Sequence, residues 1–450
     1  MNQTLIRTRA IVTMDSGRRI LPAGGILVDG NKIARVLAEK ELPVSGSFTG
    51  EVVSAENLVA IPGFVQTHIH LCQTLFRGLA DDFQLLDWLK LRIFPYEAAH
   101  NARSMYISAQ LGLAELIRSG TTTIMDMGSI HYQEEVVRAI VETGLRAFVG
   151  KAMMDENEIY PRLKEPTKDA VASTARFAEQ FHNTSGGRIR YAVAPRFVLS
   201  CSEWLLKQAY EMTVSTPGIL FHTHAAENRH ELDAVRKRCG MDNIEYFDSL
   251  RILSANTCLA HCIWLNPREV GLLSDRNVKV LHCPSSNLKL GSGVARIPEL
   301  QSRGIVVSLG ADGAPCNNSL DMFTEMRLAA LIQKPAHGPT AMDAYTTFAM
   351  ATNGGALALG LEHDVGSLEE GKKADIVLLD LDRVWNPPFD KVDAGIYSSI
   401  VYSCKPENVR SVMVDGNWLY QSGQHLALDE SKIVCEARDE LRQLLGRLEP

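Results

Sequence analysis

The sequence lacks a long apolar run. No stretch of its 450 residues stays apolar for about 18 residues, the length that a membrane-spanning helix needs. The first residues, MNQTLIRTRAIVTMD, also lack the apolar core of a secretory signal, and their composition predicts a strand of the folded protein. We therefore expect no membrane partner.

Cysteine pairs and an excess of basic charge are missing as well. The nine cysteines form no CxxC pair and no regular framework, and most lie in apolar runs, which is typical of reduced thiols in a cytoplasmic protein. The formal net charge of −7 argues against a nucleic-acid partner, which would need clustered Lys and Arg. What remains is the composition of an ordinary soluble globular enzyme.

The length exceeds what one hydrophobic core usually supports, so we expect either two domains or one large barrel with an appendage. Both ends of the chain are β-rich and share the turn sequence VDG, at 28–30 and again at 414–416. We predict a small β-sandwich domain built from residues 1–58 and 366–450, with residues 59–365 inserted between them. The last segment, 429–449, has helical periodicity and an Asp or Ser that could cap its first turn.

Between these ends, apolar strand-like runs alternate with amphipathic helical stretches. Alternation of this kind predicts an α/β fold with a parallel sheet covered by helices, and eight repeats favour a (β/α)8 TIM-type barrel. A dinucleotide-binding fold would need GxGxxG after the first strand, and that motif is absent. The eight runs are 60–71, 121–127, 145–154, 188–197, 218–227, 256–265, 278–287 and 305–314.

Polar residues gather where four of these runs end, which is where barrel enzymes carry their chemistry. His68 and His70 end the first run, and their i, i+2 spacing places both side chains on one face of a strand. The fifth run ends in HTHAAE, the sixth in a histidine and the eighth in GADGA. The residues of interest there are His224, Glu227, His261 and Asp312.

A single buried histidine is more often a hydrogen-bonded core residue than a ligand, and we interpret His222, His282 and His131 in that way. A single Asp before Gly is usually a turn residue. For the whole set, one metal ion is a simpler explanation than four separate structural roles. Three imidazoles and one carboxylate, from His68, His70, His224 and Asp312, form a suitable ligand set for Zn²⁺.

Such an ion lowers the pKa of its bound water from about 15.7 to about 7. Glu227 could then move a proton from this water to a leaving group, with His261 and Asp312 assisting. A two-metal site usually uses a lysine at the end of the fourth strand, but that run ends in APRF. We therefore expect one ion per subunit, while Lys151 on the third run leaves the two-metal alternative open.

Longer segments resemble a known family. PGFVQTHIH, HTHAAE, LAHC, SNLKLGSG and GADGAPCNNSLDMFTEMRLAAL are similar to motifs of the amidohydrolase superfamily. Over nearly the whole chain, the sequence resembles its branch of 5′-methylthioadenosine/S-adenosylhomocysteine deaminases and 5′-deoxyadenosine deaminases. The resemblance implies that His68, His70, His224 and Asp312 bind the metal. It also implies that Glu227 shuttles the proton and that His261 assists the attacking water.

The resemblance extends to substrate contacts. Glu97 matches a glutamate that accepts hydrogen bonds from the ribose hydroxyls, although by itself it would be interpreted as a solvated helix residue. Trp88 could line the 5′ side or simply pack. Relatives that accept a homocysteine tail often have arginine in place of Lys151 and histidine in place of Arg196, and Arg162 could match a second tail-binding arginine.

Three functions compete at this point. The first is hydrolytic deamination of 5′-modified adenosines, with zinc as the metal and iron as the alternative. The second is hydrolysis of another aromatic N-heterocycle, such as a triazine, a guanine-like base or a pterin, on the same scaffold. The third is a catalytically inactive binding module, which the complete set of site residues disfavours. The resemblance further implies a homo-oligomer, a dimer or a tetramer.

Overall fold

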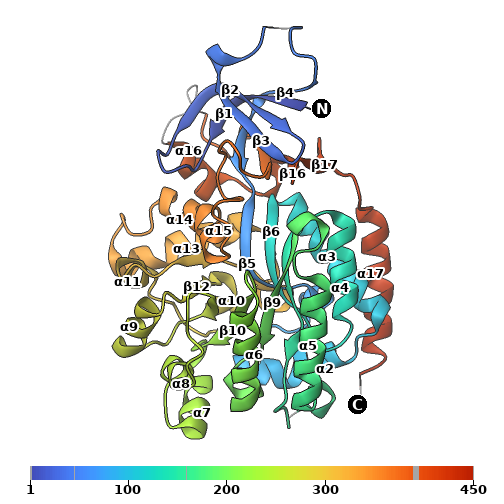
Figure 1. The fold of residues 1–450 in the computed structure, drawn as a ribbon, viewed down its shortest axis with the longest axis vertical. Coiled ribbons are helices and arrows are strands. Elements are labelled where there is room, and N and C mark those ends of the chain that lie inside the picture. Colours follow the sequence, from blue (N-terminus) through green and yellow to red (C-terminus); the bar gives the residue numbers. More distant parts are fainter. Residues whose placement is uncertain (1–2, 45, 159, 389–394, 449–450) are drawn as a thin grey trace.

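The computed structural model describes residues 3–44, 46–158, 160–388 and 395–448. Its centre is a ring of parallel strands that begins with the HxH segment (Figure 1). Every one of the eight predicted runs contains a strand of this ring, so the predicted barrel is confirmed. The strands are β5 (Phe64–His70), β6 (Thr121–Met127), β7 (Arg146–Gly150), β9 (Ile189–Pro195), β10 (Leu220–Ala225), β11 (Thr257–His261), β12 (Lys279–His282), β13 (Val307–Leu309) and β14 (Asp312–Gly313), with β8 (Ala152–Met153) paired to β9.

The eighth run closes the barrel in two pieces. β13 pairs in parallel with β12, and two residues later β14 pairs in parallel with β5, so that Asp312 lies opposite Ile69. Gly310, between the two pieces, has no room for a side chain, because an ideal Cβ there would lie 2.6 Å from the carbonyl oxygen of His68. Because the eighth run approaches the first so closely, the end of β5, which carries the HxH histidines, lies beside Asp312.

Helices cover the outside of the barrel (Figure 1). Their first turns often have the expected caps: Asn101 accepts a hydrogen bond from Ser104 N at the start of α3, and Asp321 one from Thr324 N at the start of α13. The helices that follow the barrel strands are α3 (Ala102–Arg118), α4 (Gln133–Thr143), α5 (Thr167–Phe181), α6 (Glu203–Ser215), α7 (Arg229–Cys239), α8 (Asn243–Ser249), α9 (Pro267–Asp275), α10 (Pro284–Lys289), α11 (Ile297–Ser302), α12 (Ala314–Asn317), α13 (Met322–His337), α14 (Ala344–Met350) and α15 (Asn353–Ala358).

Both ends of the chain meet in one mixed sheet beside the barrel, as predicted, although the boundaries of the two domains stay a prediction. The expected sandwich is one hydrogen-bonded sheet in the order β18-β17-β16-β15-β4-β1-β2-β3, in which β1 and β4 are parallel and the other neighbours antiparallel. Its strands are β1 (Gln3–Val12), β2 (Ile20–Asp29), β3 (Lys32–Ala38), β4 (Glu51–Pro62), β15 (Ile376–Leu379), β16 (Val409–Val414), β17 (Asn417–Gln421) and β18 (Gln424–His425).

The two VDG turns touch each other across this sheet. Gly416 has φ +77°, and an ideal Cβ at this position would lie 2.1 Å from the carbonyl oxygen of Gly30. A side chain at residue 416 would therefore clash with backbone and be strained as well. The repeated tripeptide marks the place where the first and last parts of the chain lie side by side.

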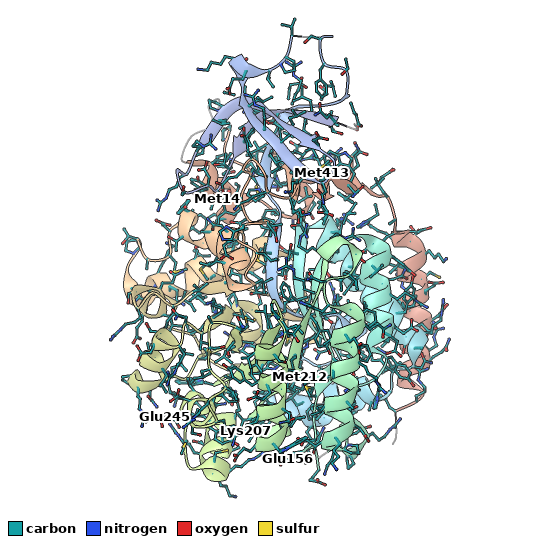
Figure 2. The ribbon with its side chains drawn as sticks, viewed as in Figure 1. Met14, Glu156, Lys207, Met212, Glu245 and Met413 are labelled. Atoms are coloured by element: carbon teal, nitrogen blue, oxygen red, sulfur yellow. The ribbon has the colours of Figure 1, made fainter. Side chains whose placement is uncertain are left out.

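The predicted C-terminal helix is α17 (Glu430–Leu445), capped by Asp429, whose side chain accepts from Lys432 N. It packs along α3 on the outside of the barrel (Figure 1). Side chains fill the interior from the barrel to the sheet, where Met14 and Met413 are almost fully buried (Figure 2). Among the described residues, none of the helices has the length and apolar character that crossing a bilayer would take.

Candidate metal centre and active site

The four predicted ligands come together inside the mouth of the barrel. One ligand atom from each of His68, His70, His224 and Asp312 lies within 4.8 Å of all the others. Asp312 Oδ1 is 3.4 Å from His68 Nε2 and 3.3 Å from His70 Nε2. β5, β10 and β14 deliver these side chains from distant parts of the sequence because parallel barrel strands all end at the same face.

The orientation of the imidazoles suits a cation. The Nδ1 of His70 donates to Met127 O at 2.7 Å, and the Nδ1 of His224 donates to Arg196 O at 2.7 Å. In its neutral form, each ring directs the lone pair of its Nε2 into the site, where the two Nε2 atoms lie 3.3 Å apart. Two facing lone pairs repel each other unless a cation or a proton lies between them. The donor set thus fits a metal such as zinc.

His222 supports this arrangement through a contact with the ring of His68. Its Nε2 lies 2.8 Å from Nδ1 of His68, while Nε2 of His68 is buried and has no hydrogen-bond partner among the described residues. Burial lowers the pKa of His68 to about 4, so its ring is neutral and can ligate. The interpretation of His222 as a hydrogen-bonded core residue agrees with this contact, and its partner is a predicted metal ligand.

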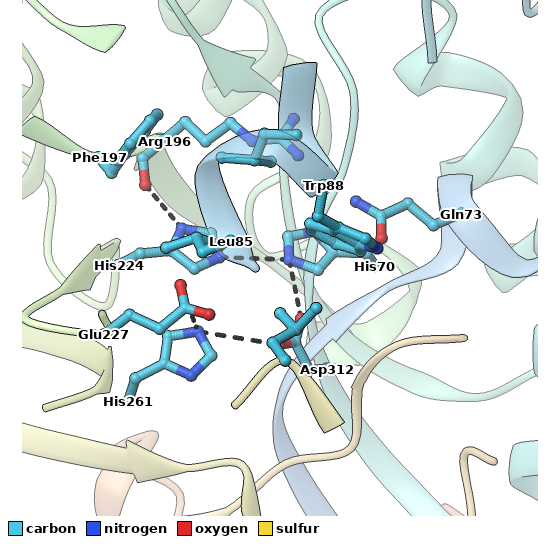
Figure 3. Close-up of a pocket in the computed structure, with 12 residues that line it drawn as sticks. His70, Gln73, Leu85, Trp88, Arg196, Phe197, His224, Glu227, His261 and Asp312 are labelled. Carbon is cyan, nitrogen blue, oxygen red and sulfur yellow. Dashed lines mark hydrogen bonds and ion pairs between the residues drawn. The ribbon is translucent and has the colours of Figure 1, made fainter. Parts of the chain in front are cut away.

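Two further groups face the cluster from the neighbouring strand ends. His261 Nδ1 donates to Asn287 Oδ1 at 2.8 Å, which leaves its Nε2 directed toward Glu227 Oε2 at 3.5 Å and Asp312 Oδ2 at 3.8 Å (Figure 3). Burial, with the negative charge of Asp312 nearby, raises the pKa of Glu227 well above its ordinary value. A carboxyl group of this kind is suited to accept and return a proton.

Strained backbone marks the same strand ends. His261 has φ +73° and Asp312 φ +62°, and Ala226, next to Glu227, has φ +52°. Non-glycine residues avoid this region, and such strain gathers at functional sites, where it aims side chains that regular strand geometry could not aim. These three residues turn the chain where the side chains of Glu227, His261 and Asp312 project from the ends of β10, β11 and the eighth run.

A pocket lies above the cluster (Figure 3). Its apolar side consists of Leu85 and Trp88, from α1 (Leu85–Trp88), together with Leu89 and Leu290. Trp88 is nearly buried, and its indole N–H has no partner among the described residues. The opposite side is polar, because Glu227, His261 and the metal-binding cluster form it. The free space in this pocket is small, about 30 Å³, so an aromatic ring could enter only if the lining side chains move apart.

Glu97 is not a solvated helix residue. It lies in α2 (Phe94–Ala98), is 1% exposed, and receives two hydrogen bonds from the Arg196 guanidinium, at 2.7 and 3.0 Å. Gln73 Nε2 donates a third, at 2.8 Å, to the same carboxylate. Arg196 and Gln73 both line the pocket, and Glu97 is held directly behind them. Sequence reasoning missed Gln73; its position three residues after His70 was the available signal.

The other two predicted substrate contacts lie elsewhere. Lys151 is buried at the end of β7, where it forms an ion pair with Glu165, and Arg162 is exposed, with one guanidinium nitrogen 3.4 Å from the carbonyl oxygen of Ala98. Neither is among the described residues that line the pocket. Contacts of Lys151 and Arg162 with substrate stay a prediction, and the position of Lys151 gives no support to a bridged two-metal site.

Comparison with known proteins agrees with this geometry. Residues 59–419 match the model of the amidohydrolase family. The chain is 39% identical to the 5′-deoxyadenosine deaminase of Methanothermobacter thermautotrophicus, over 96% of this chain and 98% of the relative. It is 34% identical to the 5-methylthioadenosine/S-adenosylhomocysteine deaminase of Pelotomaculum thermopropionicum, over 99% and 100% of the two chains.

Among solved structures, an adenosine deaminase from Xanthomonas campestris with bound zinc superimposes with a TM-score of 0.91. It is 28% identical in sequence, and the match covers 99% of both chains. The fold, the cluster of ligands and the family model point to one conclusion. The chain belongs to the amidohydrolase family.

Proposed function

We propose that this protein is a zinc-dependent aminohydrolase that converts 5′-modified adenosines into the corresponding inosine analogues and ammonia. One observation carries the proposal: Glu227 and His261 line the same pocket as His70, His224 and Asp312, three members of the cluster that His68 completes. A metal ion held by the cluster would supply a water that is readily deprotonated at neutral pH. The same residues would hold iron, which is the alternative.

Each polar group has a role that its position allows. Glu227 takes one proton of the attacking water and delivers it to N1 of the adenine ring. It then takes the remaining proton from the hydroxyl group on C6 and passes it to the departing amine, so that the C6 carbonyl forms as ammonia leaves. His261, fixed by Asn287, hydrogen-bonds the attacking oxygen through Nε2. Asp312 orients that water while it also contributes to the ligand set. This sequence of proton transfers consumes one water and releases one ammonia.

The choice of an adenine nucleoside is supported by the relatives, which are named as deaminases of 5′-deoxyadenosine and of methylthioadenosine and S-adenosylhomocysteine. Trp88 would stack on the substrate or line its 5′ side. Glu97 would act at the ribose, directly or through the two side chains that it holds, Arg196 and Gln73. We also expect a cytoplasmic homo-oligomer, a dimer or a tetramer.

Release of ammonia from purified, zinc-loaded protein tests the proposal. The panel contains 5′-deoxyadenosine, methylthioadenosine, S-adenosylhomocysteine, adenosine, guanine and a triazine, each compared by kcat/KM. We expect the 5′-modified adenosines to be the best substrates. Turnover of guanine or the triazine alone would replace the proposal with the ribose-free alternative. Tight zinc binding without turnover of any compound would support the third function, a catalytically inactive binding module.

A further inference from the structure

Asp312 faces two groups of ligand atoms. Its Oδ1 lies toward His68 and His70, at 3.4 and 3.3 Å, whereas its Oδ2 lies 3.8 Å from Nε2 of His261. The second group is completed by Cys283, which directly follows β12. Ligand atoms of His261, Cys283 and Asp312 all lie within 4.8 Å of one another, and all three residues are buried.

The ligand atoms of this second group are free to bind. Nε2 of His261 has no hydrogen-bond partner among the described residues, and the donation of Nδ1 to Asn287 leaves the Nε2 lone pair available. The sulfur of Cys283 has only a long contact, 3.7 Å, with the carbonyl oxygen of Leu281 in the part of the chain that the structure describes. An imidazole, a thiol and a carboxylate oxygen therefore meet without satisfying one another.

We propose that His261, Cys283 and Asp312 form a second, inhibitory site for a thiophilic divalent ion, with Asp312 bridging it to the first ion. On binding, the Cys283 thiol releases its proton to solvent and the sulfur coordinates the ion. Imidazole and thiolate ligands favour Zn²⁺ and Cd²⁺ over Mg²⁺ and Ca²⁺, which prefer oxygen. Three protein ligands suffice for such an ion, because water can complete its coordination.

Occupation of this site would remove His261 from the reaction. Its Nε2 would be coordinated and could no longer hydrogen-bond the attacking oxygen, and Asp312 would be shared between two cations. This consequence rests on the proposed function, whereas binding of the ion itself does not. An excess of zinc would therefore inhibit the enzyme through the second site, although the first site needs one zinc for activity.

The test begins with protein that carries one zinc per chain. The background variant Cys435→Ser removes the exposed thiol, which could otherwise bind cadmium by itself. We expect added Cd²⁺ to bind as one further equivalent by elemental analysis and to produce the near-ultraviolet absorption of a cadmium–thiolate bond. Deaminase activity should fall about tenfold or more at saturation, while Mg²⁺ should have no effect.

Cys283→Ser and Cys316→Ser form a matched pair. Both thiols are buried beside the Asp312 segment, but Cys316 donates to the carbonyl oxygen of Gly313, at 3.0 Å, and lies outside the group of three. Cys283→Ser should abolish the absorption and the second equivalent, and Cys316→Ser should retain both. Cys283→Ala, with thermal unfolding of each variant, separates loss of the ligand from misfolding.

An absorption band that survives in Cys283→Ser, or that disappears in Cys316→Ser, would overturn the proposal. Absence of any band in the parent protein would do the same. Because absorption and metal content are measured without substrate, both remain informative if no deaminase activity is found. A protein that binds the second ion but deaminates nothing would contradict the proposed function and leave this site standing.

Discussion

The guanidinium of Arg196 and the carboxylate of Glu97 form a bidentate ion pair, with hydrogen bonds of 2.7 and 3.0 Å, although the residues lie 99 positions apart. Both side chains are almost fully buried. Arg196 engages the carboxylate that the resemblance assigns to ribose. The ion pair therefore connects Arg196, in the wall of the pocket, to α2, the helix that carries Glu97.

Removal of one partner should be costly because it leaves the other charge buried and unpaired. We expect Arg196→Met to lower the free energy of unfolding by about 3–5 kcal/mol, measured by urea denaturation. The control is Arg118→Met, which breaks a half-exposed pair with Glu430 and should cost about 1 kcal/mol or less. Equal losses in the two variants would contradict the buried-pair interpretation.

Glu97→Gln addresses binding. The amide keeps the shape of Glu97 but loses the charge that holds Arg196, so KM for the best nucleoside should rise more than kcat falls. Steady-state kinetics with the nucleoside and with the free base give the comparison. If Glu97 acts at the ribose, only the nucleoside should be affected. An equal change for both substrates would instead indicate a general disturbance of the pocket.

Glu227→Gln should abolish the proton transfers and leave the metal in place. General acid–base catalysis contributes roughly 10²- to 10⁴-fold, and we expect kcat to fall by that factor with one zinc retained per chain. Glu269→Gln is the matched control. Glu269 is another buried carboxyl group, whose pKa burial raises to about 7, but it accepts hydrogen bonds from the backbone N–H groups of Ile244 in α8 and of Asn266 just before α9, away from the pocket. Its variant should lose stability and keep kcat.

His222→Phe should weaken the metal site without removing a ligand. His222 fixes the ring of His68 through a 2.8 Å hydrogen bond, and loss of such a supporting contact typically lowers metal affinity about 10- to 100-fold. Competition with a chelator measures the affinity. His282→Phe is the control, because that histidine is equally buried but its side chain has no hydrogen-bond partner among the described residues. A similar loss of affinity in both variants would point to a packing effect.

Local sequence was sufficient to predict the barrel strands and to predict that the candidate ligands lie close together. Each barrel strand is a short apolar run between helical segments, and parallel strands of this kind must place their last residues at one face. That rule brings together His70, His224 and Asp312 without any knowledge of the loops. The strands at the two chain ends were recognisable for the same reason, since they have the alternation and the turns of a sheet.

Contacts made between distant segments could not be predicted in this way. Glu97 has the local sequence of a surface helix, and only the folded chain shows that Arg196 neutralises its charge and that Gln73 donates a further hydrogen bond to it. The same holds for Asn287, which orients His261 from the helix after β12. Lys151 is a similar case: the resemblance suggested a contact with substrate, whereas its ion pair with Glu165 is seen only in the folded chain.

Low pH should destabilise the metal-free protein, and protonation of the buried His100 side chain should be one cause. Burial lowers the pKa of His100 to about 4 from an ordinary 6.5, and its neutral ring is held by the carbonyl oxygen of Cys72 at 2.8 Å and by Ser104 at 2.9 Å. Because the unfolded chain binds this proton more readily, the stabilising contribution is complete above about pH 6.5 and is lost as the pH falls toward 4.

One such proton changes the free energy of unfolding by about 1.4 kcal/mol per pH unit. His100→Gln should therefore be less stable than the parent protein at pH 7, because packing is disturbed, yet lose less stability between pH 6.5 and 4. Urea denaturation of chelator-treated protein at several pH values measures both effects. His363→Gln, which changes an exposed histidine, should keep the slope of the parent. Identical slopes for His100→Gln and the parent would show that another group causes the acid sensitivity.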